Sequence, residues 1–265
     1  SFYRDRVEAV YQELEDCGLS EESKGAIVVF HPDHKRYAEQ PFIIRKSDGA
    51  SNYATTDLAT MLYRHEHFKA TRIIVVTDDR QKDHFEQLDL TTAKWFEKTG
   101  RKRPIFDHVM FGKINGDDGK PIKSRSGDPI RLKALINEAV DRAYTIVKEK
   151  NPDFPEDELR IIAQTVGISS IKYADLSTNR TSDYVFSWEK LLAFDGNTAS
   201  YQLYAATRIQ SIFRKVDPSD LENLELRATP FETNEEIALA RKIIEFVGAI
   251  QVTIETLRPH MLSTY

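Results

Sequence analysis

Tyr53 and Asp57 are the residues of this chain whose types and spacing most directly suggest chemistry. They follow the turn KSDG, residues 46–49, and lie four positions apart, so a helix beginning here places both on one face. A carboxylate and a phenol hydroxyl on one face can bind a planar, donor-rich cation such as a guanidinium. The alternative is structural, because an acid near a helix start also complements the helix dipole and a tyrosine packs as an ordinary aromatic. The spacing leaves both interpretations open.

A second group of polar residues ends a predicted strand. The segment RIIVVTDD, residues 72–79, is a β-branched run typical of a buried parallel strand, and Gln81 follows it. In open parallel sheets, ligands bind beyond the carboxyl ends of the strands, where Asp78, Asp79 and Gln81 would lie. A solvated loop leading into a helix is the alternative.

A third candidate is the cationic loop GKPIKSRSGD, residues 119–128, in which Lys123, Ser124 and Arg125 are adjacent. A flexible loop of basic and hydroxyl side chains suits a phosphate group. Basic loops are also common on protein surfaces. Its position between a predicted strand, residues 104–114, and a strongly predicted helix favours a functional role.

The histidines predict no metal site. His31 and His34, and likewise His65 and His67, have spacings that a metal could use, but no cysteine or carboxylate set completes either pair. The chain also lacks a Gly-x-Ser-x-Gly turn and a phosphate loop of the Gly-x-x-x-x-Gly-Lys type. We therefore expect no resident metal and no covalent intermediate.

The elements that must position these residues fall into two halves. The first half alternates helices and strands: the pattern predicts helices at 4–16, at about 53–68 and after residue 81, and strands at 26–30, 41–45, 72–79 and 104–114. Residues 26–45 read as a hairpin or adjacent strands, and residues 72–114 as a parallel strand–helix–strand crossover.

The second half is predicted to be helical, with no convincing strand. Asp128 and Pro129 fit the N-cap and first residue of a helix, and Thr233 with Glu236 forms a capping box at the start of the last one. The last helix carries an apolar stripe at Ile237, Ala240, Ile244, Val247, Ile250, Ile254 and Leu257. Joints are expected at residues 152–155 and 195–197. The predicted fold class is α/β followed by all-α.

Composition excludes several classes of protein. The 265 residues carry a formal net charge of −5, so nucleic acid would have to bind a local basic patch. The one cysteine, Cys17, excludes an internal disulfide framework and indicates a reducing compartment. No apolar run is long enough to span a membrane, and the amino-terminal residues resemble a helix from the middle of a protein rather than a signal peptide. We expect an internal segment of a longer chain.

Six blocks in this order resemble the arginyl-tRNA synthetases, a family of class I aminoacyl-tRNA synthetases. The blocks are SDGASNYATTDLA, VVTDDRQKDHFEQ, FDHVMFGKI, GKPIKSRSGD, IKYADLSTNRTSDYVFSWEKLLAFDGNTASY and LYAATRIQSIFRK. The resemblance implies the second half of a Rossmann-like catalytic domain at residues 1–130, a helical connecting segment at 131–196 and the start of a helical anticodon-binding domain at 197–265.

The resemblance also implies three groups of site residues. The substrate arginine would be bound by Tyr53, Asp57 and Gln81. The adenosine of ATP would lie against Val109, Met110 and Gly112. The catalytic group that stabilises the ATP phosphates would be Lys123, Ser124 and Arg125, in a degenerate version of the family's Lys-Met-Ser-Lys-Ser loop.

The implied activity is ligation of L-arginine to tRNA(Arg) through arginyl-adenylate. ATP would be the co-substrate, with Mg²⁺ and without a prosthetic group, in a cytoplasmic monomer that does not contact a membrane. The family's His-Ile-Gly-His motif does not occur in these residues. We therefore expect the segment to be inactive alone. The alternative is a non-catalytic RNA-binding or interaction module that retains the synthetase fold.

Overall fold

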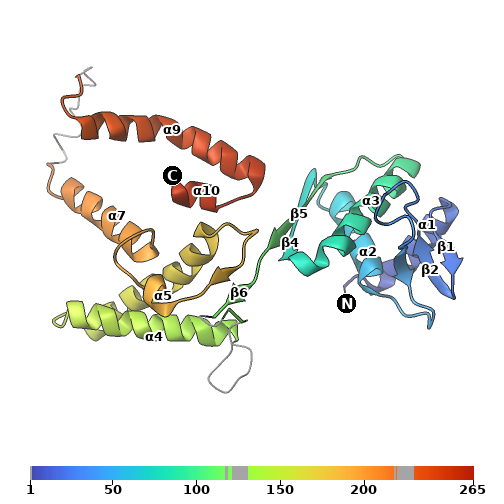
Figure 1. The fold of residues 1–265 in the computed structure, drawn as a ribbon, viewed down its shortest axis with the longest axis horizontal. Helices are drawn as coiled ribbons and strands as arrows, with labels where there is room; N and C mark the ends of the chain where they lie inside the picture. The colour runs from blue at the N-terminus through green and yellow to red at the C-terminus, as the bar shows by residue number, and fades with distance from the viewer. Residues whose placement is uncertain (1, 117–118, 121–130, 218, 220–229) are drawn as a thin grey trace. The chain divides into compact units, whose positions relative to one another are not determined.

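The computed structural model describes residues 2–116, 119–120, 131–217, 219 and 230–265. The chain forms two compact units, residues 1–111 and residues 112–265. Figure 1 shows an α/β first unit and a mainly helical second unit. The predicted fold class, α/β followed by all-α, is confirmed.

The first unit contains a small antiparallel sheet and a parallel strand pair, both packed on helices. Its elements are η1 (Arg4–Arg6), α1 (Val7–Asp16), β1 (Glu21–Ser23), β2 (Ala26–Val29), β3 (Phe42–Arg45), α2 (Tyr53–Glu66), β4 (Arg72–Asp78), η2 (Asp79–Gln81), α3 (Lys82–Lys98) and β5 (Ile105–Phe111). The predicted hairpin is confirmed, because β2 and β3 pair antiparallel. The predicted crossover is also confirmed, because β4 and β5 pair in parallel around α3.

One core holds this unit together. It joins α1, β3, α2 and α3 through side chains that are almost fully buried, among them Leu14, Ile44, Leu58, Trp95 and Phe96. The apolar stripe of the first helix is buried, as its 3.6-residue period predicts; it consists of Val7, Val10, Tyr11 and Leu14. The core fixes α2 relative to α3, and these two helices carry the candidate arginine-site residues.

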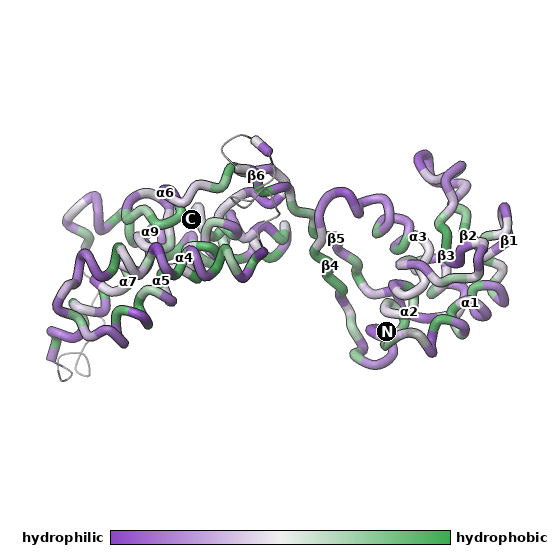
Figure 2. The backbone as a smooth tube through the Cα atoms, turned by 90° about the horizontal axis from the view of Figure 1, so that it is seen from below, coloured by the Kyte–Doolittle hydropathy of each residue, from purple (hydrophilic) through white to green (hydrophobic). Residues whose placement is uncertain are grey.

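The prediction that residues 72–79 form a fully buried strand is wrong for one face. Ile73 is buried, whereas Ile74 is 47% and Val76 61% exposed. The reason is the pleat: alternate side chains point to opposite faces of the strand, and within this unit only the face toward α3 is covered. The apolar character of β4 is visible in Figure 2.

The second unit contains β6 (Ile114–Asn115), α4 (Leu132–Lys150), α5 (Glu156–Ser177), β7 (Tyr184–Val185), α6 (Trp188–Leu191), α7 (Ala199–Phe213), α9 (Asn234–Thr256) and α10 (His260–Thr264). The expectation that this half lacks strands is wrong in one detail, because β6 and β7 form a two-residue parallel pair. Such a short pair has too few residues for a hydrophobic pattern to reveal it.

Capping residues in the sequence predict two helix starts, that of α4 and that of the last long helix, α9. In the described residues α4 begins at Leu132, with Arg131 at its N-cap in an extended conformation and without a side-chain cap, whereas the predicted cap Asp128 and first residue Pro129 lie outside the described residues. The capping box at Thr233 and Glu236 is confirmed at the start of α9. In the capping box the Thr233 hydroxyl accepts from the Glu236 N–H and the Glu236 carboxylate accepts from the Thr233 N–H, so two N–H groups at the helix start are satisfied.

Helices α4 and α5 cross closely at a glycine. A Cβ atom built on Gly167 would lie 2.8 Å from the Val140 Cα atom, so only glycine permits this approach. Ala139, Ala143 and Ala163 are fully buried and form much of the small core at the crossing. Small side chains therefore set the separation of the two helices.

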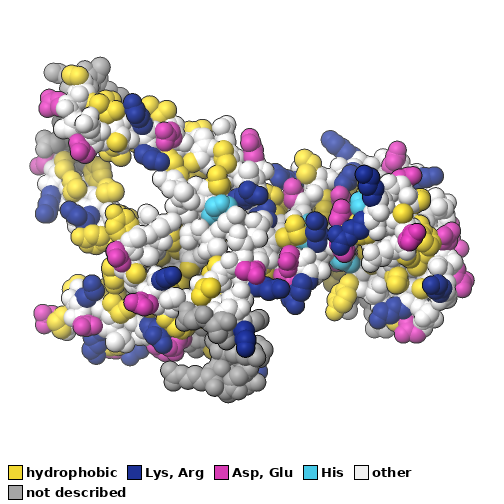
Figure 3. All heavy atoms as spheres, viewed as in Figure 1, with side chains coloured by type: hydrophobic (Ala, Val, Ile, Leu, Met, Phe, Trp, Pro, Cys, Tyr) yellow, Lys and Arg dark blue, Asp and Glu magenta, His cyan; other side chains and the backbone are white. Residues whose placement is uncertain are grey.

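The apolar stripe of α9 is exposed. Ile244 is 78% and Val247 63% exposed, and α9 contains no buried residue. Figure 3 shows apolar side chains gathered over α7 and α9. The pattern correctly predicts an amphipathic helix, but the described residues do not cover its apolar face.

Candidate substrate-binding site

A tight turn places the start of α2. The backbone N–H of Gly49 donates to the Lys46 carbonyl at 2.9 Å, and Gly49 has a φ of +78°, which favours glycine. Asn52 then takes the N-cap position, where its side chain accepts a hydrogen bond from the Thr55 N–H at 3.3 Å. As a result the helix begins at Tyr53.

Thr55, midway between Tyr53 and Asp57 in the short motif Tyr-x-Thr-x-Asp, fixes the helix to its neighbours. Its hydroxyl is fully buried, donates to the Ile44 carbonyl of β3 and contacts the Tyr11 hydroxyl of α1 at 3.0 Å. Tyr11 also donates to the Ile44 carbonyl at 3.2 Å. Thr55 thus has a structural role on the inner face of the helix, whereas Tyr53 and Asp57 lie on its outer side.

The two outward residues differ in their environment. Tyr53 is 85% exposed, so it is not the packed aromatic of the structural alternative. Asp57, one turn later, has a side chain that is about one third exposed, and its Oδ2 atom accepts a hydrogen bond from His84 Nε2 at 2.7 Å. The carboxylate is therefore tied to α3 on one side and accessible on the other.

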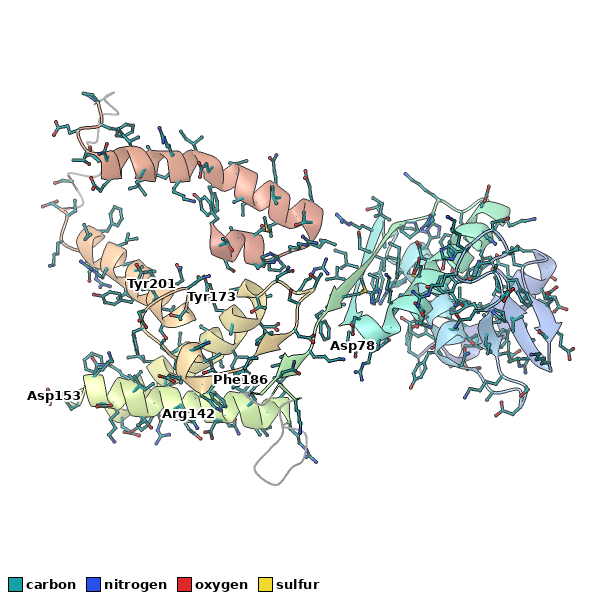
Figure 4. All side chains as sticks on the ribbon, in the orientation of Figure 1. Asp78, Arg142, Asp153, Tyr173, Phe186 and Tyr201 are labelled. Atoms are coloured by element: carbon teal, nitrogen blue, oxygen red, sulfur yellow. The ribbon has the colours of Figure 1, made fainter. Side chains whose placement is uncertain are left out.

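The end of β4 is arranged by Asp78. Its side chain accepts from the Arg80 N–H at 3.0 Å and forms an ion pair with the Arg80 guanidinium at 2.6 Å, which raises the pKa of Arg80. Figure 4 shows Asp78 at the end of β4. Gln81 closes the short helix η2 and is exposed at the start of α3. Asp78 thus acts as a helix cap, while Gln81 is available to a ligand.

The predicted adenosine residues have different environments. Val109 is buried and Met110 half-buried in β5 of the first unit, whereas Gly112 belongs to the second unit. A Cβ atom on Gly112 would lie 2.5 Å from the Ser182 carbonyl oxygen, and the Gly112 N–H donates to the Arg180 carbonyl at 2.7 Å. Close backbone packing is sufficient to explain this glycine.

The predicted phosphate-binding residues Lys123, Ser124 and Arg125 lie outside the described residues. The described parts of the chain contain no group of three or more His, Cys, Asp or Glu side chains that could hold a metal ion. His31 is buried and contacts Thr91 at 3.1 Å, and burial together with Lys94 lowers its pKa to about 4. His31 is therefore a buried residue of the protein interior, and its contacts give it a structural role.

Sequence reasoning missed His84. The predicted helix after residue 81 contains it without singling it out, although the structure brings it to Asp57, which is 27 positions away. A second histidine also bonds to a residue far away in the sequence: His108 Nε2 of β5 lies 2.7 Å from the Thr77 hydroxyl of β4. The centroid of the Phe85 ring lies 4.7 Å from that of the His108 ring. His84 lies three residues after Gln81, and residues i and i+3 share a helix face. This spacing is the signal in the sequence that could have identified His84.

The second unit contains an apolar cavity of about 620 Å³. Most of its lining is aliphatic, from α4, α5 and the β7–α6 segment, with Tyr184 and Asp175 among the polar residues. Burial raises the pKa of Tyr184 to about 12 and raises that of Asp175. None of the predicted site residues lies in this lining.

No helix in the described ranges is both long enough and apolar enough to cross a membrane.

Comparison with known proteins assigns both parts of the chain. Residues 1–188 match the family model described as tRNA synthetases class I (R), catalytic domain, and residues 202–265 match the DALR anticodon binding domain. The α/β part followed by a helical part is thus the arrangement of a class I synthetase.

Curated relatives and solved structures agree with this assignment. The chain is 43% identical over its whole length to an arginine–tRNA ligase of Chromobacterium violaceum and 44% identical to one of Azotobacter vinelandii, covering 46% and 45% of them. The crystal structure of an arginyl-tRNA synthetase from Plasmodium falciparum matches the whole chain with a TM-score of 0.82 at 28% identity, over 44% of its own length. The Thermus thermophilus enzyme, at 22% identity and a TM-score of 0.76, shows the same fold over 98% of this chain and 47% of its own. The chain therefore belongs to the class I tRNA synthetases of the arginine type and spans slightly less than half the length of the curated relatives it matches.

Proposed function

We propose that this chain is part of an arginine–tRNA ligase, which joins L-arginine to tRNA(Arg) at the expense of ATP. The observation that carries the proposal is identity above 40% over the whole chain to proteins named arginine–tRNA ligase. The pair of exposed Tyr53 and partly exposed Asp57 supports it, because this pair offers an acceptor and a phenol hydroxyl to a guanidinium.

In this proposal Tyr53, Asp57 and Gln81 bind the arginine. The carboxylate of Asp57 keeps an accessible side although His84 occupies one of its oxygens, and an ionised carboxylate can accept several hydrogen bonds. Lysine presents a single ammonium group instead of a planar fork, so it fits this acceptor geometry less well. The preference for arginine over lysine then comes from hydrogen-bond geometry rather than from charge alone.

Val109, Met110 and Gly112 contact the adenosine, and Lys123, Ser124 and Arg125 bind the phosphates in the proposed assignment. The arginine carboxylate attacks the α-phosphate of ATP, which enters with its Mg²⁺ ion as the substrate complex, and pyrophosphate leaves. A ribose hydroxyl of the tRNA then takes the arginyl group and releases AMP. Positioning and charge stabilisation supply the rate, and neither step needs an enzyme nucleophile.

The division into a catalytic part at residues 1–130, a connecting segment at 131–196 and the start of an anticodon-binding domain at 197–265 is part of the same proposal. The full protein is proposed to be a cytoplasmic monomer. We expect the 265 residues to be inactive alone, because the relatives are about twice as long and the His-Ile-Gly-His motif is absent from these residues.

Pyrophosphate exchange by the full-length protein, with arginine, ATP and tRNA(Arg) present, tests the proposal. We expect arginine-dependent exchange, and we expect Asp57→Ala to raise the KM for arginine at least about tenfold because a charged hydrogen-bond partner is lost. The KM for ATP should change little. Equal effects on both would contradict the role of Asp57, and tRNA binding without any exchange would favour the non-catalytic RNA-binding alternative.

A further inference from the structure

The contact between His84 and Asp57 joins the two helices that carry the proposed arginine site. His84 Nε2 lies 2.7 Å from Asp57 Oδ2, at the short end of the range for a hydrogen bond to a carboxylate. An ionised carboxylate can only accept, so Nε2 carries the proton and the imidazole is the donor. The interaction is therefore directional and holds one oxygen of Asp57 in place.

The imidazole is itself held by its surroundings. Its side chain is 25% exposed, and its ring centroid lies 5.6 Å from that of Phe42 in β3 and 4.9 Å from that of Phe85 in α3. Tyr53, by contrast, is 85% exposed and has no comparable support in its described contacts. His84 is thus a fixed group behind Asp57, whereas Tyr53 is open to the solvent.

A carboxylate that recognises a guanidinium must be held at a defined angle, because both hydrogen bonds of a bidentate pair depend on the plane of the acceptor. Free rotation of Asp57 about its side-chain bonds would have to be lost when the ligand binds, at the expense of affinity. A donor bonded to Oδ2 removes much of that freedom beforehand while leaving acceptor positions for the ligand. His84 also lies three residues after Gln81, so one short stretch at the start of α3 supplies both a proposed ligand contact and this support.

We propose that His84 is a positioning residue for arginine selection: it orients the Asp57 carboxylate for the guanidinium without touching the substrate. This inference rests on the proposed function and deepens it. It adds to the three proposed arginine-binding residues a fourth residue that acts through Asp57.

The test compares variants of the full-length protein in arginine-dependent pyrophosphate exchange. His84→Phe keeps the ring contacts with Phe42 and Phe85 but removes the donor, and we expect it to raise the KM for arginine about tenfold with little change in the KM for ATP. His84→Gln keeps an N–H donor at a similar reach, and it should restore the KM for arginine to within about threefold of the unmodified protein.

Competition with citrulline separates positioning from general damage. Citrulline replaces the guanidinium by a neutral urea, so it depends less on an oriented carboxylate. We expect His84→Phe to weaken arginine about tenfold and citrulline much less, which lowers the arginine-to-citrulline preference. A merely structural role of His84 would weaken both amino acids alike.

The chain offers a control in a second histidine–carboxylate contact, between His34 of the β2–β3 connection and Glu86, which lies on α3 as His84 does. His34 Nε2 lies 3.6 Å from Glu86 Oε1, and the His34 ring stacks on Tyr37 at 4.6 Å. His34→Phe and His34→Gln should leave the KM for arginine and the citrulline competition unchanged.

Three results would overturn the inference: an unchanged KM for arginine in His84→Phe, an equal loss in His84→Gln, or an equal loss for arginine and citrulline. If His84→Phe does not fold, His84→Asn, whose amide is too short to reach Asp57, is compared with His84→Gln by the same criteria. Failure of the unmodified protein to activate arginine would contradict the proposed function itself, whereas a loss in Asp57→Ala without a loss in His84→Phe contradicts only the role of His84.

Discussion

Three residues of one short motif have different roles because they lie on different sides of one helix. Thr55 is fully buried and bonded to β3 and α1, whereas Tyr53 is exposed and Asp57 reaches the surface from its contact with α3. The buried threonine positions the helix start, and the outward pair is available for a ligand. Stability and recognition are therefore separable within the motif.

Substitutions at Tyr53 and Thr55 should separate these two roles. In the full-length protein we expect Tyr53→Phe to raise the KM for arginine roughly ten- to hundredfold through loss of a hydrogen bond to a charged group, with an unchanged melting temperature. We expect Thr55→Val to lower the free energy of unfolding by about 1 kcal/mol, because the buried Ile44 carbonyl loses one of its two side-chain donors and keeps the one from Tyr11. Thermal melting and exchange kinetics on both variants check this. A stability loss in Tyr53→Phe would contradict the separation.

His31 gives the first unit a dependence on pH. Its buried imidazole has a pKa lowered to about 4, so the folded state favours the neutral form. The stabilisation is complete above the unfolded value near 6.5 and is lost as the pH falls toward 4, by about 2 kcal/mol at pH 5.

Urea unfolding at pH 7.5 and pH 5 measures this dependence, with Trp95 as the fluorescent probe in a Trp188→Phe background. His31→Gln should reduce the loss of stability between the two pH values, because glutamine does not titrate. His67→Gln, at an exposed histidine of the same unit, should retain it. The hypothesis fails if both variants show the same pH dependence.

At the scale of elements, two glycines within helices differ in the space around them: one lies against a neighbouring helix and the other does not. Gly167 lies where α5 crosses α4 and has backbone atoms of Val140 and Ala139 within 3 Å of a built Cβ atom. Gly248 lies in α9, and apart from the adjacent backbone of that helix no atom of the described residues lies within 4 Å of its Cβ position. Helix propensity favours alanine at both positions, so the difference between them measures packing alone.

We expect Gly167→Ala to lower the free energy of unfolding of the second unit by about 1–3 kcal/mol, because backbone atoms must move apart. Gly248→Ala should leave stability unchanged or raise it by up to about 1 kcal/mol through helix propensity. Denaturant unfolding followed by circular dichroism compares the two. A neutral Gly167→Ala would show that the crossing can relax.

At the scale of the molecule, each unit exposes an apolar face. In the first unit the face of β4 and β5 away from α3 exposes Val76 and Ile105, each above 60%. In the second unit the stripe of α9 is open at Ile244 and Val247. Contiguous apolar surface of this kind marks a protein–protein contact or an aggregation-prone surface. Relatives about twice as long as this chain contain further residues that can cover it.

The 265-residue chain should therefore bind more of the dye ANS per mole than the full-length protein. In the isolated chain Ile244→Glu should reduce dye binding and self-association, whereas in the full-length protein the same change should lower stability by burying an unpaired charge. Gln251→Glu, at an exposed polar position of α9, serves as the control and should do neither. If Ile244→Glu has the same mild effect in both proteins, the face is not covered in the full-length protein.

The sequence by itself determined the elements and the family. Periodicity predicted the core face of α1, the turn at Gly49 started α2, and the capping box started α9, because these signals lie within a few residues of the structure they specify. The order of the motifs gave the resemblance that the family models bear out.

Tertiary structure alone decided which residues meet. The sequence paired Tyr53 with Asp57 because they are four positions apart, but it could not pair Asp57 with His84 or identify the close approach at Gly167. Those contacts join elements far apart in the chain, and they are set by how side chains from several elements fill a common core. No local pattern records that packing, so the support behind the proposed arginine site became visible only in the fold.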